Sequence, residues 1–543
     1  MRSALIIGSG PAAAGAALAL AARPAVKVTV LDVGAELDPE HGAAFDRLAA
    51  MAPPELEALA HEVPNNEPAA RSRRQLPEKK VYGSGFPFAD NGQLRGVHSS
   101  EATSSALISG AYGGFSNVWG AQLMPFIDAS FDMWPISAAE MRCHYRAICE
   151  QVPISGEEDD LSELFPHPKD PSPLPPLSPR TVMVLSNYAR HRERIRKLGV
   201  TVGHATLAFR AASCVRCGLC MTGCPYSLIY SSSQTFDELR LAKKLDYHGG
   251  LVVYRVEETA ESAVVHAVEA RSGNHVEFAA DRVYVACGAI GTTRLVLGSL
   301  GLVDREVTLG ESVQFFFPSL SVRAAPDPRN LHDFTLGQFN VVIDYGSPGA
   351  GLGADHSQVQ FYPYNPSVSQ ALPRFMSAKL AAPVNAQLLS RLTIGLGYLP
   401  SWASPRLRAK VTSLLPGGLP SLELGQGEWP PGRPVLNKVL SKLLRSAGSL
   451  DLWPIIPQLT LARGGLSYHF GGSFPHRARS AAPSALTTDR VGRLPAWSRV
   501  HLVDGSVFPT VPATTFVLTL MANAHRIASE SLALSDEHVA APR

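Results

Sequence analysis

Residues 3–32 read SALIIGSGPAAAGAALALAARPAVKVTVLD, and this stretch decides the fold. The apolar run Ala4–Gly8 predicts a buried strand, and the alanine-rich run at about Ala12–Ala22 predicts a helix that follows a glycine turn. A second apolar run, Val26–Asp32, predicts another strand, which ends in an acid. Strand, turn, helix and strand in this order indicate a parallel sheet with a crossover helix, and therefore an α/β fold.

The turn between the first strand and the helix has the pattern G-x-G-x-x-A, formed by Gly8, Gly10 and Ala13. The first glycine allows the tight turn, the second lets the backbone approach a pyrophosphate, and the small third residue lets helix pack on strand. Unpaired N–H groups and the helix dipole favour the anion there. Asp32, 24 residues after Gly8, ends the next strand, where a carboxylate can accept from ribose hydroxyls. The stretch predicts a Rossmann-like dinucleotide site and does not separate NAD from FAD.

The composition of the whole chain excludes several classes of protein. The 543 residues suffice for more than one domain, and 45% hydrophobic with 18% charged residues exclude a disordered chain. A net charge of +2 gives no reason to expect a nucleic-acid partner. No apolar run approaches the ~20 residues needed to cross a bilayer. The N-terminus resembles an export signal, but Gly8 and Gly10 interrupt its apolar region, so we expect a cytoplasmic protein.

Further motifs are spread along the chain. Gly113–Gly120 reads GGFSNVWG, Cys287–Leu295 reads CGAIGTTRL, Tyr468–Ser473 reads YHFGGS and Val503–Pro509 reads VDGSVFP. Together with the glycine fingerprint, and in this order, they resemble the glucose–methanol–choline (GMC) family of FAD-dependent oxidoreductases.

The resemblance implies FAD and two domains, of which the first is discontinuous. We expect residues 1–315 and 464–543 to form a Rossmann-like FAD-binding domain, with a cysteine-rich segment at 205–235. Residues 316–463 should form a mainly antiparallel substrate domain, so the chain is α/β in its first domain and α+β overall.

The resemblance also assigns cofactor-binding positions. The glycine-rich segment that runs along the flavin in relatives places Gly114, Ser116 and Asn117 beside it. Asp504 and Gly505 match residues near the pyrophosphate and ribityl chain, and Val256 matches a strand whose backbone meets the adenine.

His469 is the candidate catalytic base. In the family, a histidine in a His-x-x-Gly-Ser pattern accepts the substrate hydroxyl proton while hydride leaves for flavin N5, and histidine is the usual side chain for a base near neutral pH. Relatives carry a second histidine or an asparagine about where Thr514 or Thr515 stands here. Threonine offers hydrogen bonds but no base at pH 7, so His469 acts largely alone or is assisted by another side chain, for which His476 and His525 are candidates.

Four of the seven cysteines crowd into one short run, Cys214-x2-Cys217-x2-Cys220-x3-Cys224, followed by a proline. This spacing matches the bacterial ferredoxin run and predicts one 4Fe–4S cluster. In two-cluster ferredoxins the fourth cysteine of the run binds the other cluster, so a single cluster here requires either that Cys224 fold back or that a remote cysteine replace it. Zinc, an empty thiol loop and disulfides remain alternatives.

The predicted function is hydride removal from a CH–OH group to FAD. A sugar-like substrate is the first choice, because aromatic residues are frequent in the expected substrate domain, and a lipidic or polycyclic alcohol is the second. If the cluster forms, electrons pass to an acceptor protein, which favours a dehydrogenase over an oxidase. The stretch Phe375–Trp402 is apolar and basic, which fits a buried helix pair or, less well, contact with a membrane surface. A non-redox lyase or isomerase that keeps FAD, and an electron-transfer subunit without its own substrate, remain alternatives.

Overall fold

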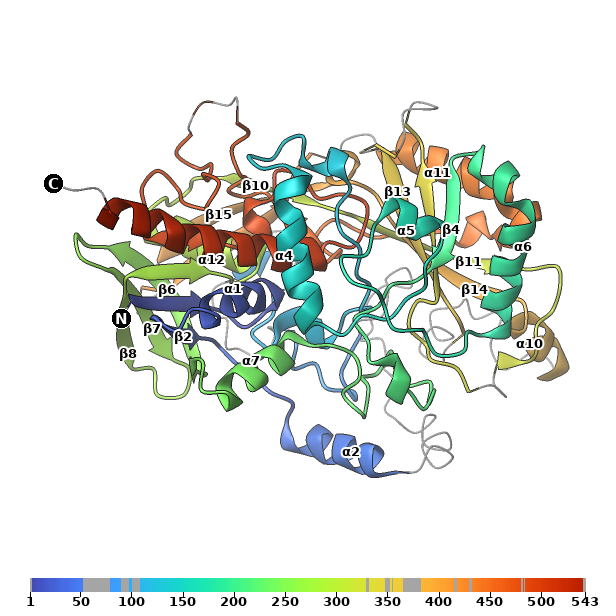
Figure 1. Cartoon of the computed structure of the whole chain (residues 1–543), viewed down its shortest axis with the longest axis horizontal. Helices are drawn as coiled ribbons and strands as arrows, with labels where there is room; N and C mark the ends of the chain where they lie inside the picture. The colour runs from blue at the N-terminus through green and yellow to red at the C-terminus, as the bar shows by residue number, and fades with distance from the viewer. Residues whose placement is uncertain are drawn as a thin grey trace.

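The structure is a computed structural model of the whole chain (Figure 1). It describes residues 2–51, 79–88, 97–99, 108–328, 332–346, 352–353, 355–364, 382–414, 418–428, 432–479, 482 and 484–540. The basic patch at residues 71–74 lies outside these ranges.

A parallel five-stranded sheet forms the part of the molecule that contains the glycine fingerprint. In sheet order its strands are β20 (Val500–Leu502), β9 (Arg282–Val285), β1 (Arg2–Ile7), β2 (Val26–Leu31) and β5 (Asp246–His248). The sequence therefore supplies this sheet from its N-terminus, its middle and its C-terminal region, which makes the Rossmann-like unit discontinuous as expected.

A seven-stranded antiparallel sheet forms the other end of the molecule, where α6 and α11 flank it (Figure 1). Its strands are β17 (Trp453–Pro454), β11 (Gln314–Leu320), β14 (Leu392–Tyr398), β13 (His356–Tyr362), β12 (Phe339–Asp344) and β4 (Val200–His204), with β18 (Thr460–Leu461) beside β11. The strand β4 comes from outside residues 316–463.

Two smaller sheets join these layers. One has the order β19 (Phe470–Gly471), β10 (Val307–Glu311), β15 (Arg406–Leu414), β16 (Pro420–Gln426) and β3 (Val97–Ser99). The other is an antiparallel meander of β6 (Leu251–Glu258), β7 (Ala263–Glu269) and β8 (His275–Ala280).

The α-helices pack against the faces and ends of these sheets. They are α1 (Pro11–Ala21), α2 (Pro39–Ala50), α4 (Ala138–Gln151), α5 (Asp160–Leu164), α6 (Pro179–Arg196), α7 (Ser232–Leu241), α8 (Ala289–Ser299), α10 (Ala382–Leu389), α11 (Gly432–Leu450) and α12 (Val517–Ala540). Among the residues described, no helix is both long and apolar enough to cross a membrane.

The fingerprint region folds as its pattern predicts. β1, α1 and β2 follow one another, and α1 starts one residue earlier than expected because Pro11 occupies its first turn. Proline is favoured there, since its missing N–H would have no partner in the helix and its φ is already helical. The sequence also predicts a helix at Ala289–Ser299, after the buried run Arg282–Ala286, and the structure confirms it as α8.

The stretch Ala371–Leu415 is apolar and basic with helical spacing, and the helix that this pattern predicts is wrong beyond α10. Residues 371–381 lie outside the described part, and the rest contains β14 and β15. In β14, a side chain added at Gly395 or Gly397 would come within 2.8 Å of Phe317 or 2.2 Å of Phe315, so the glycines make room for rings of β11. Pairing with β11 and β13 overrides the local pattern, so the described part of Phe375–Trp402 contains one α-helix, α10, and the strand β14 instead of a helix pair.

The helix α1 packs closely against α12 (Figure 1). Both are rich in alanine where they meet, and the closest approach occurs at Gly15, where a Cβ would lie 2.2 Å from the Met521 carbonyl oxygen. Because the obstacle is backbone, it cannot rotate away. This contact fixes α1, and with it the fingerprint turn, against the C-terminal helix.

We expect Gly15→Ala to destabilise the protein by about 1–3 kcal/mol, because the methyl group must push two helix backbones apart. The midpoint of thermal unfolding, followed by circular dichroism, should fall by several degrees. Gly42→Ala in α2 is the matched control. It meets no atom within 4 Å and should be neutral or slightly stabilising. Equal midpoints of thermal unfolding for Gly15→Ala and Gly42→Ala would contradict the close packing of α1 against α12.

Candidate active site

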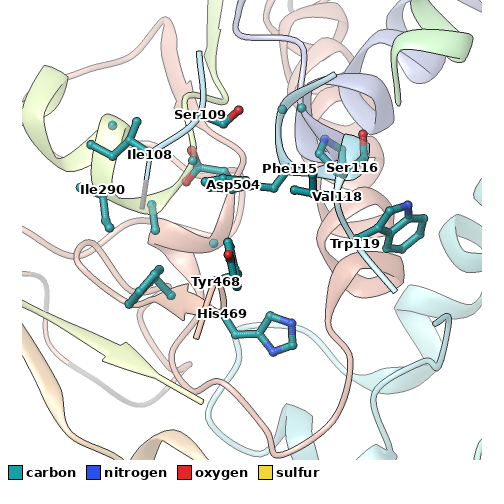
Figure 2. A pocket seen from close by; sticks show the side chains of 18 of the residues that line it. Ile108, Ser109, Phe115, Ser116, Val118, Trp119, Ile290, Tyr468, His469 and Asp504 are labelled. Atoms are coloured by element: carbon teal, nitrogen blue, oxygen red, sulfur yellow. The ribbon is translucent and has the colours of Figure 1, made fainter. Parts of the chain in front are cut away.

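A cavity of about 650 Å³ lies where the parallel sheet, the meander and the seven-stranded sheet meet. It is large enough for a sizeable ligand. In Figure 2, Ile108 and Ile290 lie to one side of this pocket and Val118 and Trp119 to the other, with Asp504 between them. Its lining includes both the glycine fingerprint and His469, so one continuous space connects the predicted cofactor site with the predicted base.

The fingerprint turn leaves room for an anion. Gly8 has φ +106°, and a Cβ there would come within 2.6 Å of the Ala286 carbonyl oxygen, so only glycine fits between the strands. Gly10 caps α1 without any side-chain hydrogen bond, and no protein atom lies within 4 Å of where its Cβ would be. The first N–H groups of α1 therefore face open space, as a pyrophosphate requires.

Asp32 lies on the same cavity at the end of β2, with only 7% of its surface exposed. Burial raises the pKa of its carboxyl to about 7, although hydrogen bonds from Ser9, Tyr247 and the backbone at Val33 and Gly34 oppose the shift. The Tyr247 hydroxyl donates to Asp32 over 2.9 Å, and Ser9 donates to the same oxygen. This carboxylate is thereby held in position to accept from ribose hydroxyls.

The two C-terminal motifs contact each other beneath the cavity. Asp504 lines it, is buried, and accepts from the Thr292 hydroxyl and from the Ser506 N–H at 2.9 Å. The N–H of Gly472 donates to the carbonyl oxygen of Gly505 over 3.0 Å. Gly505 lines the cavity too, so the His-x-x-Gly-Ser segment and the Asp-Gly segment form one wall.

Some predicted cofactor residues lie elsewhere. Gly114 and Ser116 line the cavity, whereas the Asn117 amide donates to the carbonyls of Tyr112 and Gly114, at 2.9 and 2.8 Å, and so shapes the loop. Ala13 is fully buried within α1 and supports its packing.

The meander contributes a different part of its first strand than we expected. Leu251–Tyr254 line the cavity, while Val256 lies outside the lining and donates its N–H to the Ser299 hydroxyl at 2.9 Å.

The residues present fit FAD. An uncapped helix N-terminus, a carboxylate at the end of β2 and a second buried carboxylate at Asp504 face one cavity that continues to His469. Cys287, whose thiol pKa is raised by burial, lies on the same wall and has no part in the cysteine run.

His469 lies on the cavity wall just before β19, and Figure 2 shows its ring projecting from that backbone into the pocket. The ring stacks on Tyr398, with centroids 5.0 Å apart, and meets Phe516 edge-on at 4.6 Å. Its Nδ1 is buried without a hydrogen-bond partner. Burial lowers the pKa of His469 to about 3, so the imidazole is neutral and able to take a proton.

A buried glutamate holds the segment that carries His469. Glu311, at the end of β10, is fully buried and accepts from the Gly465 N–H at 2.6 Å. The Ser467 hydroxyl hydrogen-bonds the same carboxyl and accepts from the His469 N–H at 3.2 Å. Burial raises the pKa of Glu311 to about 8. Sequence reasoning missed Glu311, since no motif marks it.

Of the two threonines proposed at the second catalytic position, Thr515 lines the cavity and Thr514 does not. The Thr515 hydroxyl is buried without a partner, while its N–H donates to Gln358 at 3.1 Å. Thr515 therefore supplies an unpaired hydroxyl near His469.

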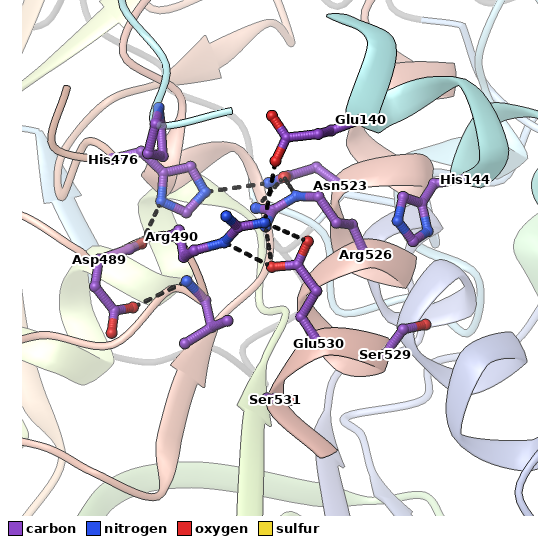
Figure 3. A network of polar contacts seen from close by, with 12 residues as sticks. Glu140, His144, His476, Asp489, Arg490, Asn523, Arg526, Ser529, Glu530 and Ser531 are labelled. Carbon is purple, nitrogen blue, oxygen red and sulfur yellow. Dashed lines mark hydrogen bonds and ion pairs between the residues drawn. The ribbon is translucent and has the colours of Figure 1, made fainter. Parts of the chain in front are cut away.

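The other two candidate histidines have structural partners away from the cavity. His476 lies 2.8 Å from the carbonyl oxygen of Asp489 through Nδ1, and His525 on α12 lies 2.9 Å from His144, between their Nδ1 atoms. Figure 3 shows the ion-pair network beside them, made of Glu140, Arg490, Arg526 and Glu530. Neither His476 nor His525 lines the cavity.

The seven-stranded sheet supplies the floor of the cavity near His469. Alternate residues on three neighbouring strands face it, namely Gln314 and Phe316 of β11, Gln360 and Tyr362 of β13, and Leu396 and Tyr398 of β14. The intervening Phe315, Phe317 and Phe361 point to the opposite face and form a second core with α6 and α11. Of the aromatic residues expected as substrate platforms, Phe316, Tyr362 and Tyr398 line the cavity, whereas Trp402 and Trp453 are exposed. Sequence reasoning missed Gln314 and Gln360. The signal for them was the alternation of side chains along each strand, which puts them on the same face as Phe316 and Tyr362.

We expect Gly10→Val to reduce the flavin content of the purified protein at least tenfold, because its side chain would project into the anion site. The circular dichroism spectrum should not change, since no protein atom lies within 4 Å of the new Cβ. The control Gly85→Ala, which also meets no atom within 4 Å, should retain flavin. Full occupancy in Gly10→Val would exclude this binding mode.

No protein-family model matches this chain, and no curated protein matches it in sequence. Solved structures do match over nearly its full length. Pyridoxine 4-oxidase from Mesorbium loti has a TM-score of 0.60 and 14% identity, covering 98% of this chain and 99% of its own. Formate oxidase has a TM-score of 0.60 and 13% identity, with 99% of both chains covered. An Aspergillus oryzae RIB40 formate oxidase variant, studied for FAD modification, has a TM-score of 0.58 and 13% identity, also with 99% of both chains covered.

At this level of identity the comparison concerns the fold. The motifs along the sequence and the geometry of the cavity agree with it. The chain shares the fold of these oxidases, in agreement with the fold class that its sequence motifs predicted.

Proposed function

We propose that this protein is an FAD-dependent oxidoreductase of GMC type that removes hydride from a CH–OH group. The observation that carries the proposal is that a neutral histidine, His469, faces the same cavity as an uncapped Rossmann helix N-terminus. The structural neighbours named pyridoxine 4-oxidase and formate oxidase support an oxidoreductase.

FAD, when bound here, supplies the acceptor for the hydride. His469 takes the proton from the substrate hydroxyl, which raises the electron density on the oxygen and favours loss of hydride from the carbon. Tyr398 and Phe516 hold the imidazole in one orientation through ring contacts, and they shield it from water. The unpaired Thr515 hydroxyl is available to hydrogen-bond the substrate oxygen as its charge changes.

A neutral, polyhydroxylated substrate of the sugar class suits the cavity floor best. The lining residues of β11, β13 and β14 carry amides, phenols and apolar groups but no charge. The Gln122 side-chain nitrogen is buried, unpaired and on the cavity wall. Amides and phenols hydrogen-bond hydroxyl groups, and the ring of Phe316 offers an apolar face for a sugar ring. A lipidic alcohol would leave these polar groups unpaired.

The fate of the electrons separates a dehydrogenase from an oxidase. We propose a dehydrogenase, in which electrons leave through an iron–sulfur cluster at the cysteine run and reach an acceptor protein.

Replacing His469 with Ala should lower kcat about 10²–10⁴-fold with a sugar or polyol that the wild-type protein oxidises, because this is the usual contribution of a general base. Flavin content should remain, because His469 is not part of the anion site. His191→Ala, on α6 and outside the cavity lining, is the control and should keep full activity. Stopped-flow loss of flavin absorbance under anaerobic conditions measures the step directly. If no alcohol in a panel of sugars, polyols and long-chain alcohols bleaches the wild-type flavin, the protein is not an alcohol oxidoreductase.

The pH dependence follows from the low pKa of His469. Burial disfavours the charged imidazolium, so the neutral base persists well below the ordinary histidine pKa of about 6.5. We expect log kcat/KM to stay level from pH 7 to about pH 5, since this quantity reports groups of the free enzyme. A tenfold loss per pH unit that begins near 6.5 would show that His469 titrates normally or that another group is the base.

A further inference from the structure

The four cysteines of the run lie near one another in the fold. Each of the four thiols lies within electrostatic range of the other three, including Cys214 with Cys224 across the whole run. None is paired in a disulfide. The structure therefore folds Cys224 back onto the first three cysteines, and no remote cysteine is needed to complete the set.

Every thiol of this set also accepts backbone N–H groups. The N–H of Arg216 points to the Cys214 sulfur at 3.4 Å, and the N–H of Thr335 points to the Cys220 sulfur at 3.3 Å. Cys217 accepts from the N–H of Leu219. Cys224 accepts from the N–H groups of Tyr226, Leu228 and Ile229. Hydrogen bonds of this kind stabilise negatively charged sulfur ligands and tune clusters that they hold.

The loop backbone is curled to achieve this convergence. Arg216, Gly218, Gly223 and Ser227 have φ of 56°, 76°, 112° and 51°, so the chain turns at each cysteine pair. A side chain at Gly223 would lie 3.0 Å from the ring of Tyr82, and the N–H of Tyr82 donates to Thr222 at 2.8 Å. The curled loop is fixed from both sides, since Thr335 also donates its hydroxyl to Gly218 at 3.0 Å.

The loop that carries the thiols reaches the cavity wall through one of its residues. Met221, the neighbour of Cys220, lines the cavity. Lys79 lines it as well, lies within electrostatic range of Cys220 and Cys224, and donates to the Trp119 carbonyl at 2.8 Å.

Gly120, which follows Trp119, shows where the hydrogen bond between Lys79 and Trp119 lies along the cavity. A Cβ at Gly120 would come within 2.9 Å of the Tyr362 hydroxyl, on the floor that faces His469. Lys79 and the Trp119–Gly120 segment therefore connect the neighbourhood of the thiols with the cavity wall that includes Tyr362.

We propose that Cys214, Cys217, Cys220 and Cys224 bind a 4Fe–4S cluster that takes electrons from the reduced flavin. Among the residues described, no three metal-binding side chains converge as ligands of a single ion. In a cubane cluster each thiolate binds its own iron, so the proposal requires four neighbouring but separated sulfurs and not four ligands of a single ion. The buried Lys79 ammonium offsets part of the negative charge of such a site.

The electron balance rests on the proposed CH–OH oxidation. Each turnover removes two electrons and two protons from the alcohol and yields a carbonyl. A cluster carries one electron at a time, so it passes two electrons in succession to an external one-electron carrier, such as a haem protein. Two carriers are reduced for each alcohol oxidised, and the protons go to solvent.

The test is the metal content of the full-length protein purified without oxygen. We expect about four irons and about four acid-labile sulfides per chain, and an electron paramagnetic resonance signal that appears on reduction with dithionite. This measurement needs no substrate, so it stands even if the alcohol-oxidation proposal fails. Iron absent from protein that contains flavin, or one zinc per chain in its place, would overturn the cluster.

Variants assign the site and the electron route. Cys220→Ser should lower iron and sulfide at least fourfold, and Cys217→Ser should do the same. Cys143→Ser, at an exposed position on α4, is the matched control and should keep the wild-type content. With an alcohol that bleaches the flavin, Cys220→Ser should bleach within twofold of the wild-type rate but reduce ferricyanide at least tenfold more slowly. Unchanged iron in both variants would exclude these ligands, and unchanged ferricyanide reduction would exclude the electron route.

Discussion

The close approach of backbone around the turn from Gly8 to Gly10 is the constraint on which the site depends. The carbonyl of Ala286 lies where a Cβ of Gly8 would stand, and a side chain at Gly114 would touch Gly10 at 3.2 Å. The Ser9 hydroxyl donates to Asp32 and accepts from the N–H of Gly113 at 2.9 Å. Segments from four regions of the chain therefore meet at one turn, and they leave the first N–H groups of α1 free for an anion.

The two faces of the seven-stranded sheet differ: one packs against helices in a hydrophobic core, and the other lines the cavity. Because side chains alternate along a strand, one face of β11, β13 and β14 packs phenylalanines against α6 and α11, and the other presents glutamines, phenols and Phe316 to the cavity. The packed face holds the strands in register, and this register positions the cavity floor below His469. In the proposed reaction, this rigid floor and the ring contacts of Tyr398 and Phe516 restrict both the substrate and the His469 imidazole to few orientations.

The sequence alone predicted the Rossmann unit, the helix α8 and the two motifs that carry Asp504 and His469, because each depends on a local pattern. The sequence assigned Val256, Ala13 and Asn117 to the cofactor site. These residues lie outside the cavity lining, although their segments contribute to it. The sequence pattern also predicted helix where β14 forms. Gly395 and Gly397 are needed there because the rings of Phe317 and Phe315 on β11 pack over them, and this contact cannot be read from the local sequence.

The sequence by itself determined that an anion-binding turn, a histidine motif and a run of four cysteines exist in this chain. These are properties of short segments, in which spacing fixes the geometry. Tertiary structure alone decided that Thr515 and not Thr514 reaches the cavity, that Glu311 holds the His469 segment, and that Cys224 lies near the other thiols of the run. Each of these depends on contacts between residues far apart in the chain, and no local pattern encodes such contacts.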